Sequence, residues 1–220
     1  KNPKKITIAV NAGHGTKGGE KVRTICHPDG TRKVTGGTNA AGSTTALAVS
    51  SGMTFKDGTK EATVTGQMGH IFAKKLLDAG YDVLLIRDGD DVQLDNVART
   101  VLANNKADAH IALHWDSTEK DKGAFFMSVP DSLKKMEPVA SHWESHEKLG
   151  ESLISGLKGK GVKIFSSGSM DMDLTQTSYS TVTSVDIELG DKISDHSEKQ
   201  LNLLGDALVD GVNKYYGFTS

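Results

Sequence analysis

The order of apolar segments along the chain is the feature that most restricts its fold. A β-branched run at residues 6–10 ends in the glycine-rich segment NAGHG, and further apolar runs follow at 81–88 (YDVLLIRD) and 108–116 (DAHIALHWD). We expect 81–88 to form a buried strand. Apolar residues recur at intervals of three and four between these runs, over 61–79 and 94–105, which predicts two helices. Alternating strands and helices imply right-handed crossovers and a largely parallel sheet.

The second half of the chain continues this pattern. Residues 123–129 (GAFFMSV) and 182–190 (VTSVDIELG) are typical of strands, whereas 139–157 and the leucine stripe of 201–212 are typical of helices. For the earlier helix at 94–105, the residues expected to face the core are Val97, Val101 and Leu102. We therefore expect an α/β fold of three layers, with a mostly parallel central sheet, helices on both faces, and one domain spanning residues 1–220.

One long segment interrupts this order after the first strand. Residues 16–60 are rich in Gly, Thr and Ser (TGGTNAAGSTT, SSGMTFKDGTK) and have no helical period, so we expect an insert of loops with a hairpin. Connections of this length are uncommon and are usually functional. The insert is expected to be a substrate-groove wall, a regulatory lid or a docking surface for a protein partner.

Composition excludes several classes of function. The 26 Lys and Arg residues against 28 Asp and Glu give a formal net charge of −2, so no basic field suggests nucleic-acid binding. Apolar runs such as VLLI end far short of the roughly 20 residues needed for a membrane span. The single cysteine, Cys26, cannot form an internal disulfide. The opening KNPKKITIAVNAG lacks a starter Met and a small-residue cleavage site, so we expect a trimmed segment whose targeting sequence has been lost.

Several polar residues follow or end the expected strands. Ligands of open α/β sheets bind beyond the carboxyl ends of the strands, and His14, His114 and Glu188 all fall near such ends. A hydrolytic zinc site needs three protein ligands and an open position, and two His with one Glu form such a set. Glu61, which opens its helix, supplies the carboxylate, while Glu188 remains free to accept a proton from water. Asp186, on the same strand face as Glu188, is a supporting carboxylate.

The same residues also have ordinary structural interpretations. His14 fits a polar loop residue, His114 fits a core histidine with a hydrogen-bond partner, and Glu61 fits an acidic first-turn residue that complements the helix dipole. Glu188 is harder to explain, because a carboxylate after the apolar VDI segment is costly unless partnered. Residue spacing alone leaves the metal site and the structural alternatives open.

A rival arrangement occurs in SHWESHEKLGE. His142 and His146 lie one helical turn apart and could share a metal, but their order differs from the HExxH of metalloproteases. We favour a solvated, charged helix face for this segment. Trp143 and Trp115 are candidates for contact with sugar or peptide, and Trp115 is the stronger because it follows His114.

A family resemblance favours the metal site. It is carried, in chain order, by AVNAGHG, EATVTGQMGHIFAKKLLDAGYDVLLIRD, VARTVLANNKADAHIALHWDS, GAFFMSV and VDIELGD. This combination resembles the zinc-dependent N-acetylmuramoyl-L-alanine amidase family and leaves the insert uncovered. The resemblance implies one Zn²⁺ per chain bound by His14, Glu61 and His114, with Glu188 as the catalytic base. The implied substrate is peptidoglycan, cleaved at the amide between N-acetylmuramic acid and the L-alanine of the stem peptide.

The chain departs from the family pattern at three points. Asn11 stands where the family usually has Asp, and Trp115 and Asp116 replace a small residue and Asn. We expect these residues to lie behind the ligands. The long insert also leaves Glu20 as an alternative ligand. Glu61 is preferred because the amino-acid sequence that follows it matches the family.

The family's R…AN segment contains two further polar residues. Arg99 is expected to be structural, pairing with a carboxylate or with helix carbonyls, and Asn104 is expected to cap its helix.

The resemblance also carries expectations about biological setting. We expect an extracellular or cell-wall enzyme, secreted or phage-delivered, that is monomeric and is able to bind a protein partner through the insert. Phage lysis, cell separation and sporulation would all use this chemistry. Two alternatives remain: a zinc peptidase of similar architecture, which commonly needs two metals, and a non-catalytic protein that binds the cell wall or a partner.

Overall fold

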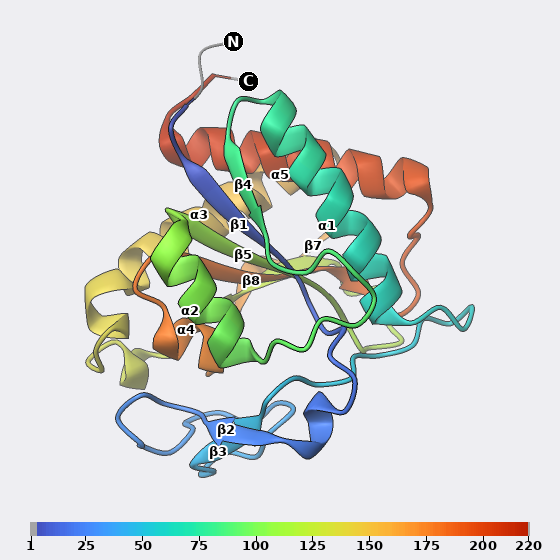
Figure 1. Ribbon diagram of the computed structural model, residues 1–220. Helices are drawn as coiled ribbons and strands as arrows, with labels where there is room; N and C mark the ends of the chain where they lie inside the picture. The colour runs from blue at the N-terminus through green and yellow to red at the C-terminus, as the bar shows by residue number, and fades with distance from the viewer. Residues whose placement is uncertain (1–3, 220) are drawn as a thin grey trace.

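The computed structural model describes residues 4–219 and shows a three-layer α/β fold (Figure 1). Within those residues the central sheet has six strands in the order β4-β1-β5-β8-β6-β7. The strands are β1 (Thr7–Ala12), β4 (Asp82–Leu85), β5 (Ala109–Asp116), β6 (Ala124–Ser128), β7 (Ile164–Asp171) and β8 (Thr183–Asp191). All neighbouring strands are parallel except β6 and β8, which are antiparallel. The predicted, mostly parallel sheet is therefore confirmed.

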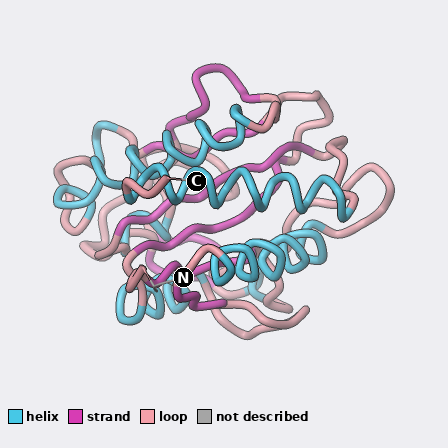
Figure 2. The backbone as a smooth tube through the Cα atoms, turned by 90° about the horizontal axis from the view of Figure 1, so that it is seen from above, coloured by secondary structure: helices cyan, strands magenta, loops and turns pink. Residues whose placement is uncertain are grey.

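Helices cover both faces of this sheet. They are α1 (Glu61–Asp78), α2 (Asn96–Lys106), α3 (Val139–Gly159), α4 (Thr175–Tyr179) and α5 (Glu198–Tyr216). Helices α1, α5 and α3 lie side by side over one face, where the largest group of buried apolar side chains packs (Figure 2). Helices α2 and α4 contact each other on the opposite face, where Ala9 and Ala103 belong to a smaller apolar cluster.

Local sequence explains where the helices begin and end. Asp95 caps α2 by accepting a 2.7 Å hydrogen bond from Ala98 N, and Ser197 caps α5 in the same way. Gly217 follows α5 with φ 74°, the left-handed conformation that suits glycine at a helix end. Glu61 opens α1 without capping it, and its side chain is therefore available for the contacts described below.

Two expectations about burial were wrong. Val101 of α2 is 44% exposed, and the buried residues of that helix are Arg99, Thr100 and Ala103. This face turns inward because Arg99 bonds to main-chain oxygens beside β1. The segment at 81–88 was expected to form a buried strand, but β4 is half-buried because it forms an edge of the sheet.

The insert forms the hairpin that its composition indicated. A short 3₁₀ turn at Gly19–Lys21 leads to β2 (Arg23–Ile25), which pairs antiparallel with β3 (Thr45–Leu47). Figure 1 shows this hairpin below the carboxyl end of β1, apart from the central sheet. The insert therefore lies at the end of the sheet where the candidate ligands were expected.

None of the helices within the described residues is long and apolar enough to cross a membrane.

Candidate metal centre and active site

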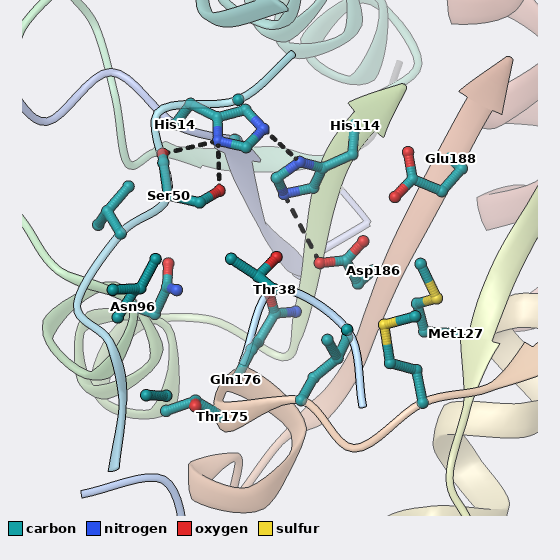
Figure 3. A pocket seen from close by; sticks show the side chains of 18 of the residues that line it. His14, Thr38, Ser50, Asn96, His114, Met127, Thr175, Gln176, Asp186 and Glu188 are labelled. Carbon is teal, nitrogen blue, oxygen red and sulfur yellow. Dashed lines mark hydrogen bonds and ion pairs between the residues drawn. The ribbon is translucent and has the colours of Figure 1, made fainter. Parts of the chain in front are cut away.

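Three side chains from distant parts of the chain meet beyond the carboxyl ends of β1 and β5. His14 follows β1, Glu61 begins α1, and His114 lies near the end of β5. His14 Nε2 lies 2.9 Å from Glu61 Oε1 and 3.0 Å from His114 Nδ1, which lies 3.3 Å from Glu61 Oε1. One ligand atom from each residue therefore falls within 4.8 Å of the others, as a group that could hold a metal ion. Figure 3 shows the two imidazoles facing each other.

The orientation of His14 is set by its backbone and by one carbonyl. Its φ of 65° is unusual for a residue other than glycine, and Arg99 Nη2 donates a 2.6 Å hydrogen bond to its carbonyl oxygen. His14 Nδ1 lies 2.9 Å from the carbonyl oxygen of Ser50. Because a carbonyl can only accept, Nδ1 donates to it, and Nε2 is left facing the cluster as the nitrogen available to a metal.

Glu61 is held as a buried carboxylate. It is 3% exposed, Oε1 accepts a 3.0 Å bond from Trp115 N, and Oε2 accepts a 2.9 Å bond from Met53 N. Burial raises the pKa of Glu61, but hydrogen bonds from His114 and His14 outweigh burial and hold that pKa well below its ordinary value. The side chain is therefore ionised, as a metal ligand must be.

His114 lies between carboxylates on both sides of its ring. Its Nδ1 faces Glu61, and its Nε2 lies 3.6 Å from Asp186 Oδ2. Burial lowers the pKa of His114, but Asp186, Glu61 and Glu188 outweigh burial and raise that pKa to about 10. The surrounding negative charge favours a cation at this position, which a bound metal ion would supply in place of the proton.

Two glycines leave the space in which the ligands fit. A Cβ added at Gly13 would lie 2.1 Å from His114 Cε1, and one added at Gly52 would lie 2.9 Å from His14 Cδ2. A larger residue at either position would displace a ligand ring. The glycines of the NAGHG and SSG segments therefore shape the site directly.

Glu188 and Asp186 project from β8 toward the same cluster. Both alternate with core residues along the strand and lie beside His114 in Figure 3. Burial raises the pKa of both carboxyl groups. Glu188 Oε2 has no hydrogen-bond partner among the residues that the structure describes. A carboxyl group that lines a cleft and whose pKa is raised by burial is suited to accept and return a proton.

The cluster opens into a cleft of about 540 Å³. One side is formed by the insert, including Thr38 and Ser50, and another by Met127 of β6 and Gln176 of α4 (Figure 3). The candidate ligands therefore face a space large enough for part of a chain-like substrate.

Asn11 and Arg99 support the turn that carries His14. Asn11 donates to His110 Nε2 and accepts a 3.0 Å bond from Arg99 Nη1. Arg99 also bonds to Ala12 O and His14 O, and burial lowers its pKa to about 10. Neither side chain touches Glu61 or His114, so these contacts agree with the structural role expected for Arg99.

Trp115 and Asp116 follow His114 at the end of β5. The Trp115 ring is 2% exposed and packs against Phe55, so the expected stacking on sugar or peptide is wrong. Its side chain points into the core because residues alternate along β5, whereas its main-chain N–H holds Glu61. Asp116 is half-buried and pairs with Lys122 at 2.8 Å.

The remaining candidates lie outside the cluster. Glu20 lines the cleft, but the three converging ligand atoms belong to other residues. His146 was expected on a solvated helix face, yet it is 3% exposed and its Nδ1 accepts a 2.9 Å bond from Ser184 N. That expectation was wrong because β6 pairs with β8 only at residues 187 and 188, so the main chain of Ser184 needs another partner. Asn104, expected to cap α2, instead bonds to the main chain of Tyr179 and Thr181 beyond α4.

Sequence analysis overlooked two residues that build the site. Arg87 is 1% exposed and donates to Ala12 O, Gly13 O and Ala62 O, so it supports the same turn as Arg99. An arginine directly after the apolar run VLLI was a usable signal, because a buried charge requires partners. Ser50 gave no signal, because its main-chain oxygen orients His14.

Comparison with known proteins places this arrangement in a family. Residues 8–212 match the family model described as N-acetylmuramoyl-L-alanine amidase. None of the curated proteins matches the chain by sequence.

Solved structures of amidases share the fold. The apo N-acetylmuramyl-L-alanine amidase Ami1 from Mycobacterium abscessus is 19% identical, with a TM-score of 0.77 over 96% of this chain and 99% of that chain. The amidase AmiC2 of Nostoc punctiforme is 17% identical, with a TM-score of 0.68 over 98% and 99%. The CwlD amidase from Clostridioides difficile, solved in complex with the GerS lipoprotein, is 17% identical, with a TM-score of 0.63 over 96% and 98%. The family match and the shared architecture support a peptidoglycan amidase function, and the chain belongs to the N-acetylmuramoyl-L-alanine amidase family.

Proposed function

We propose that this chain hydrolyses the amide between N-acetylmuramic acid and the L-alanine of the stem peptide, with one zinc ion held by His14, Glu61 and His114. The observation that carries the proposal is the convergence of these three ligand atoms within 4.8 Å at the mouth of a cleft. Glu188 lies in the same cleft and is the proposed catalytic base.

The donor set fits zinc. Two imidazole nitrogens and one carboxylate oxygen, with a fourth position open, are characteristic of catalytic zinc sites. His14 Nε2 faces the cluster because Nδ1 is held by the Ser50 carbonyl, and Glu61 is ionised as a metal ligand must be. Zinc at such a site supplies a Lewis acid that polarises a carbonyl group and lowers the pKa of water.

The protein's own groups account for the proton transfers and for the orientation of the site. Glu188, which lines the cleft, accepts a proton from the attacking water and returns it to the departing L-alanine nitrogen. Asp186 lies against the far nitrogen of the His114 ring and orients that ring. Main-chain N–H groups of Trp115 and Met53 hold the two oxygens of Glu61.

The proposed substrate and the related amidases indicate the location in which the protein acts. Peptidoglycan amidases act in the cell wall or periplasm, and we propose a secreted or phage-delivered, monomeric enzyme whose catalytic domain spans residues 1–220. The insert is the proposed surface for a protein partner. The CwlD amidase in complex with a lipoprotein supports such a partner, because CwlD shares this fold.

The test is to incubate the zinc-loaded protein with purified peptidoglycan, with and without a chelator, and to identify the newly exposed amino groups. We expect L-alanine amino termini that disappear with the chelator. Glu61→Gln should lose zinc and activity, whereas Glu20→Gln should keep both, because Glu20 lines the same cleft outside the cluster.

Other outcomes would replace the proposal. New amino termini of other residues would identify a peptidase, and two zinc ions per chain would favour a two-metal mechanism. Stoichiometric zinc without any new termini would identify a binding protein or an enzyme that needs an activating partner.

A further inference from the structure

Asp173 joins the insert to the loop between β7 and α4 through both its side chain and its main chain. Its carboxylate oxygens accept from His27 Nε2 at 2.9 and 3.0 Å, and Oδ2 also accepts from Val34 N at 2.7 Å. Its main-chain oxygen accepts from Lys33 Nζ, and its main-chain N–H donates to Thr35 Oγ1 at 2.9 Å. These residues are more than 130 positions apart in the sequence, so the contacts fasten one segment of the fold to another.

These contacts are buried, although the insert itself is a surface excursion. His27 is 0% exposed, Asp173 is 1% exposed and Lys33 is 7% exposed. The Lys33 ammonium also lies 3.8 Å from Asp173 Oδ1, which balances the buried charge. Removal of one member of a buried, hydrogen-bonded charge group leaves the other uncompensated, so such a group strongly favours a single arrangement. A lid that opens and closes would have to break this group in each cycle.

The fastened segment leads directly into the wall of the cleft. Lys33, Val34 and Thr35 are followed by Gly36, Gly37, Thr38 and Asn39, all four of which line the cleft. A Cβ added at Gly37 would lie 3.6 Å from Met172 Sδ, so the Met172 side chain lies close to Gly37 beside Asp173. Figure 3 shows Thr38 in the cleft together with Asp186 and Gln176.

We infer that Asp173 is a positioning residue that fixes residues 36–39 of the insert as a permanent wall of the cleft. Among the roles open to the insert, this favours the groove wall over the lid. A wall held in place before substrate arrives reduces the ordering cost of binding, so its loss should weaken binding more than it slows chemistry. The kinetic part of this inference rests on the proposed function, whereas the structural part does not.

The test compares Asp173→Asn with Asp88→Asn in the zinc-loaded protein. Asp88 forms a 2.7 Å contact with His70 on the exposed surface, so it is a matched His–Asp pair outside the cleft. Amide hydrogen exchange of residues 33–39 and limited proteolysis report on the wall without any need for turnover. Binding and hydrolysis of N-acetylmuramoyl-L-alanyl-D-isoglutamine report on the cleft, and zinc content reports on the ligands.

For Asp173→Asn we expect exchange of the Val34 amide to rise about tenfold or more. We expect KM to rise about tenfold, with kcat within about twofold and zinc content unchanged. Asp88→Asn should match the wild type in every measurement. Unchanged exchange and KM in Asp173→Asn would overturn the inference, as would a fall in kcat at constant KM.

A second variant covers the case in which Asp173→Asn fails to fold. Thr35→Val removes one acceptor and leaves the charges of the group intact, so a smaller rise in exchange and KM is expected. Wild-type exchange and KM in this variant would count against the inference. If the wild type releases no L-alanine, the proposed function fails, while hydrogen exchange and binding of the muramyl peptide still decide whether the wall is fixed.

Discussion

Replacement of Gly13 by alanine should weaken zinc binding at least about 100-fold while the fold survives. Gly13 precedes His14, and an ideal Cβ at this position would lie 2.1 Å from His114 Cε1, 2.4 Å from Nε2 and 2.6 Å from Nδ1. The whole imidazole ring, rather than one flexible atom, occupies the space that the methyl group would need. No alternative is open to the ring without leaving the cluster, because Glu61 and Asp186 flank its two nitrogens.

The size of the effect follows from the distances. Ordinary van der Waals contact begins at 3.4 Å, so the ring or the main chain must retreat by about 1.3 Å from the 2.1 Å position. Metal–ligand distances tolerate changes of about 0.2 Å. We therefore expect zinc affinity to fall by at least about 100-fold, the upper end of the effect of disturbing a ligand's surroundings. Overpacking should cost about 1–3 kcal/mol of the roughly 5–15 kcal/mol that holds a domain together.

The assay is competition between the protein and a chelator of known zinc affinity, combined with urea unfolding of the zinc-free protein. Gly159→Ala is the matched control, because a Cβ there meets nothing within 4 Å and the residue ends α3, far from the cluster in sequence. The control should bind zinc like the wild type and unfold at the same or slightly higher urea concentration. Wild-type zinc affinity in Gly13→Ala would refute the assignment of His114 as a ligand.

Three further predictions follow from the same structure. Glu188→Gln should keep stoichiometric zinc, measured by metal analysis, and lose roughly 10²–10⁴-fold in the release of L-alanine termini; near-normal turnover would exclude it as the base. Arg99→Met should lower the free energy of unfolding in urea by about 3 kcal/mol, because it leaves several buried oxygens beside His14 without a donor, and a change below about 0.5 kcal/mol would contradict this role. Burial lowers the pKa of His110 to about 3 and of His146 to about 4. In the unfolded chain these two imidazoles take up protons at a higher pH than in the folded protein, so the free energy of unfolding should fall as the pH drops from about 6.5 toward 4. Equal urea midpoints for the wild type at pH 7 and pH 5 would contradict that last prediction.

Local patterns predicted most helices and strands of this fold, but not β7 or α4. The three-and-four spacing of apolar residues located α1 and α5, and short apolar runs located β1 and β5, because helices and strands are set by contacts between near neighbours in sequence. The alternation of these elements then predicted the parallel sheet, since crossovers between parallel strands have one favoured hand. The same reasoning placed His14 and His114 at strand ends on one edge of the sheet.

The tertiary structure decided which residues are buried and which residues contact one another. The inward face of α2 carries Arg99 instead of Val101, because the turn beside it supplies carbonyl groups that need donors. His146 is buried for a similar reason, since β8 pairs with β6 only at residues 187 and 188 and the main-chain N–H of Ser184 bonds to His146 instead. The periodicity of a helix in the sequence detects only its apolar face. It does not identify a face that is buried because its polar side chains form hydrogen bonds.

The site, too, depended partly on the sequence and partly on the tertiary structure. Residue types and their order named His14, Glu61 and His114, but their convergence required the strand order β1-β5-β8 and the entry of α1 beside β1. The link between His27 and Asp173 spans 146 positions and left no pattern in the sequence, because a hydrogen bond between residues this far apart produces no local periodicity. The sequence thus determined most of the helices and strands and the residue types at their ends. Long-range packing decided which polar side chains line the same cleft and which part of the insert lies beside them.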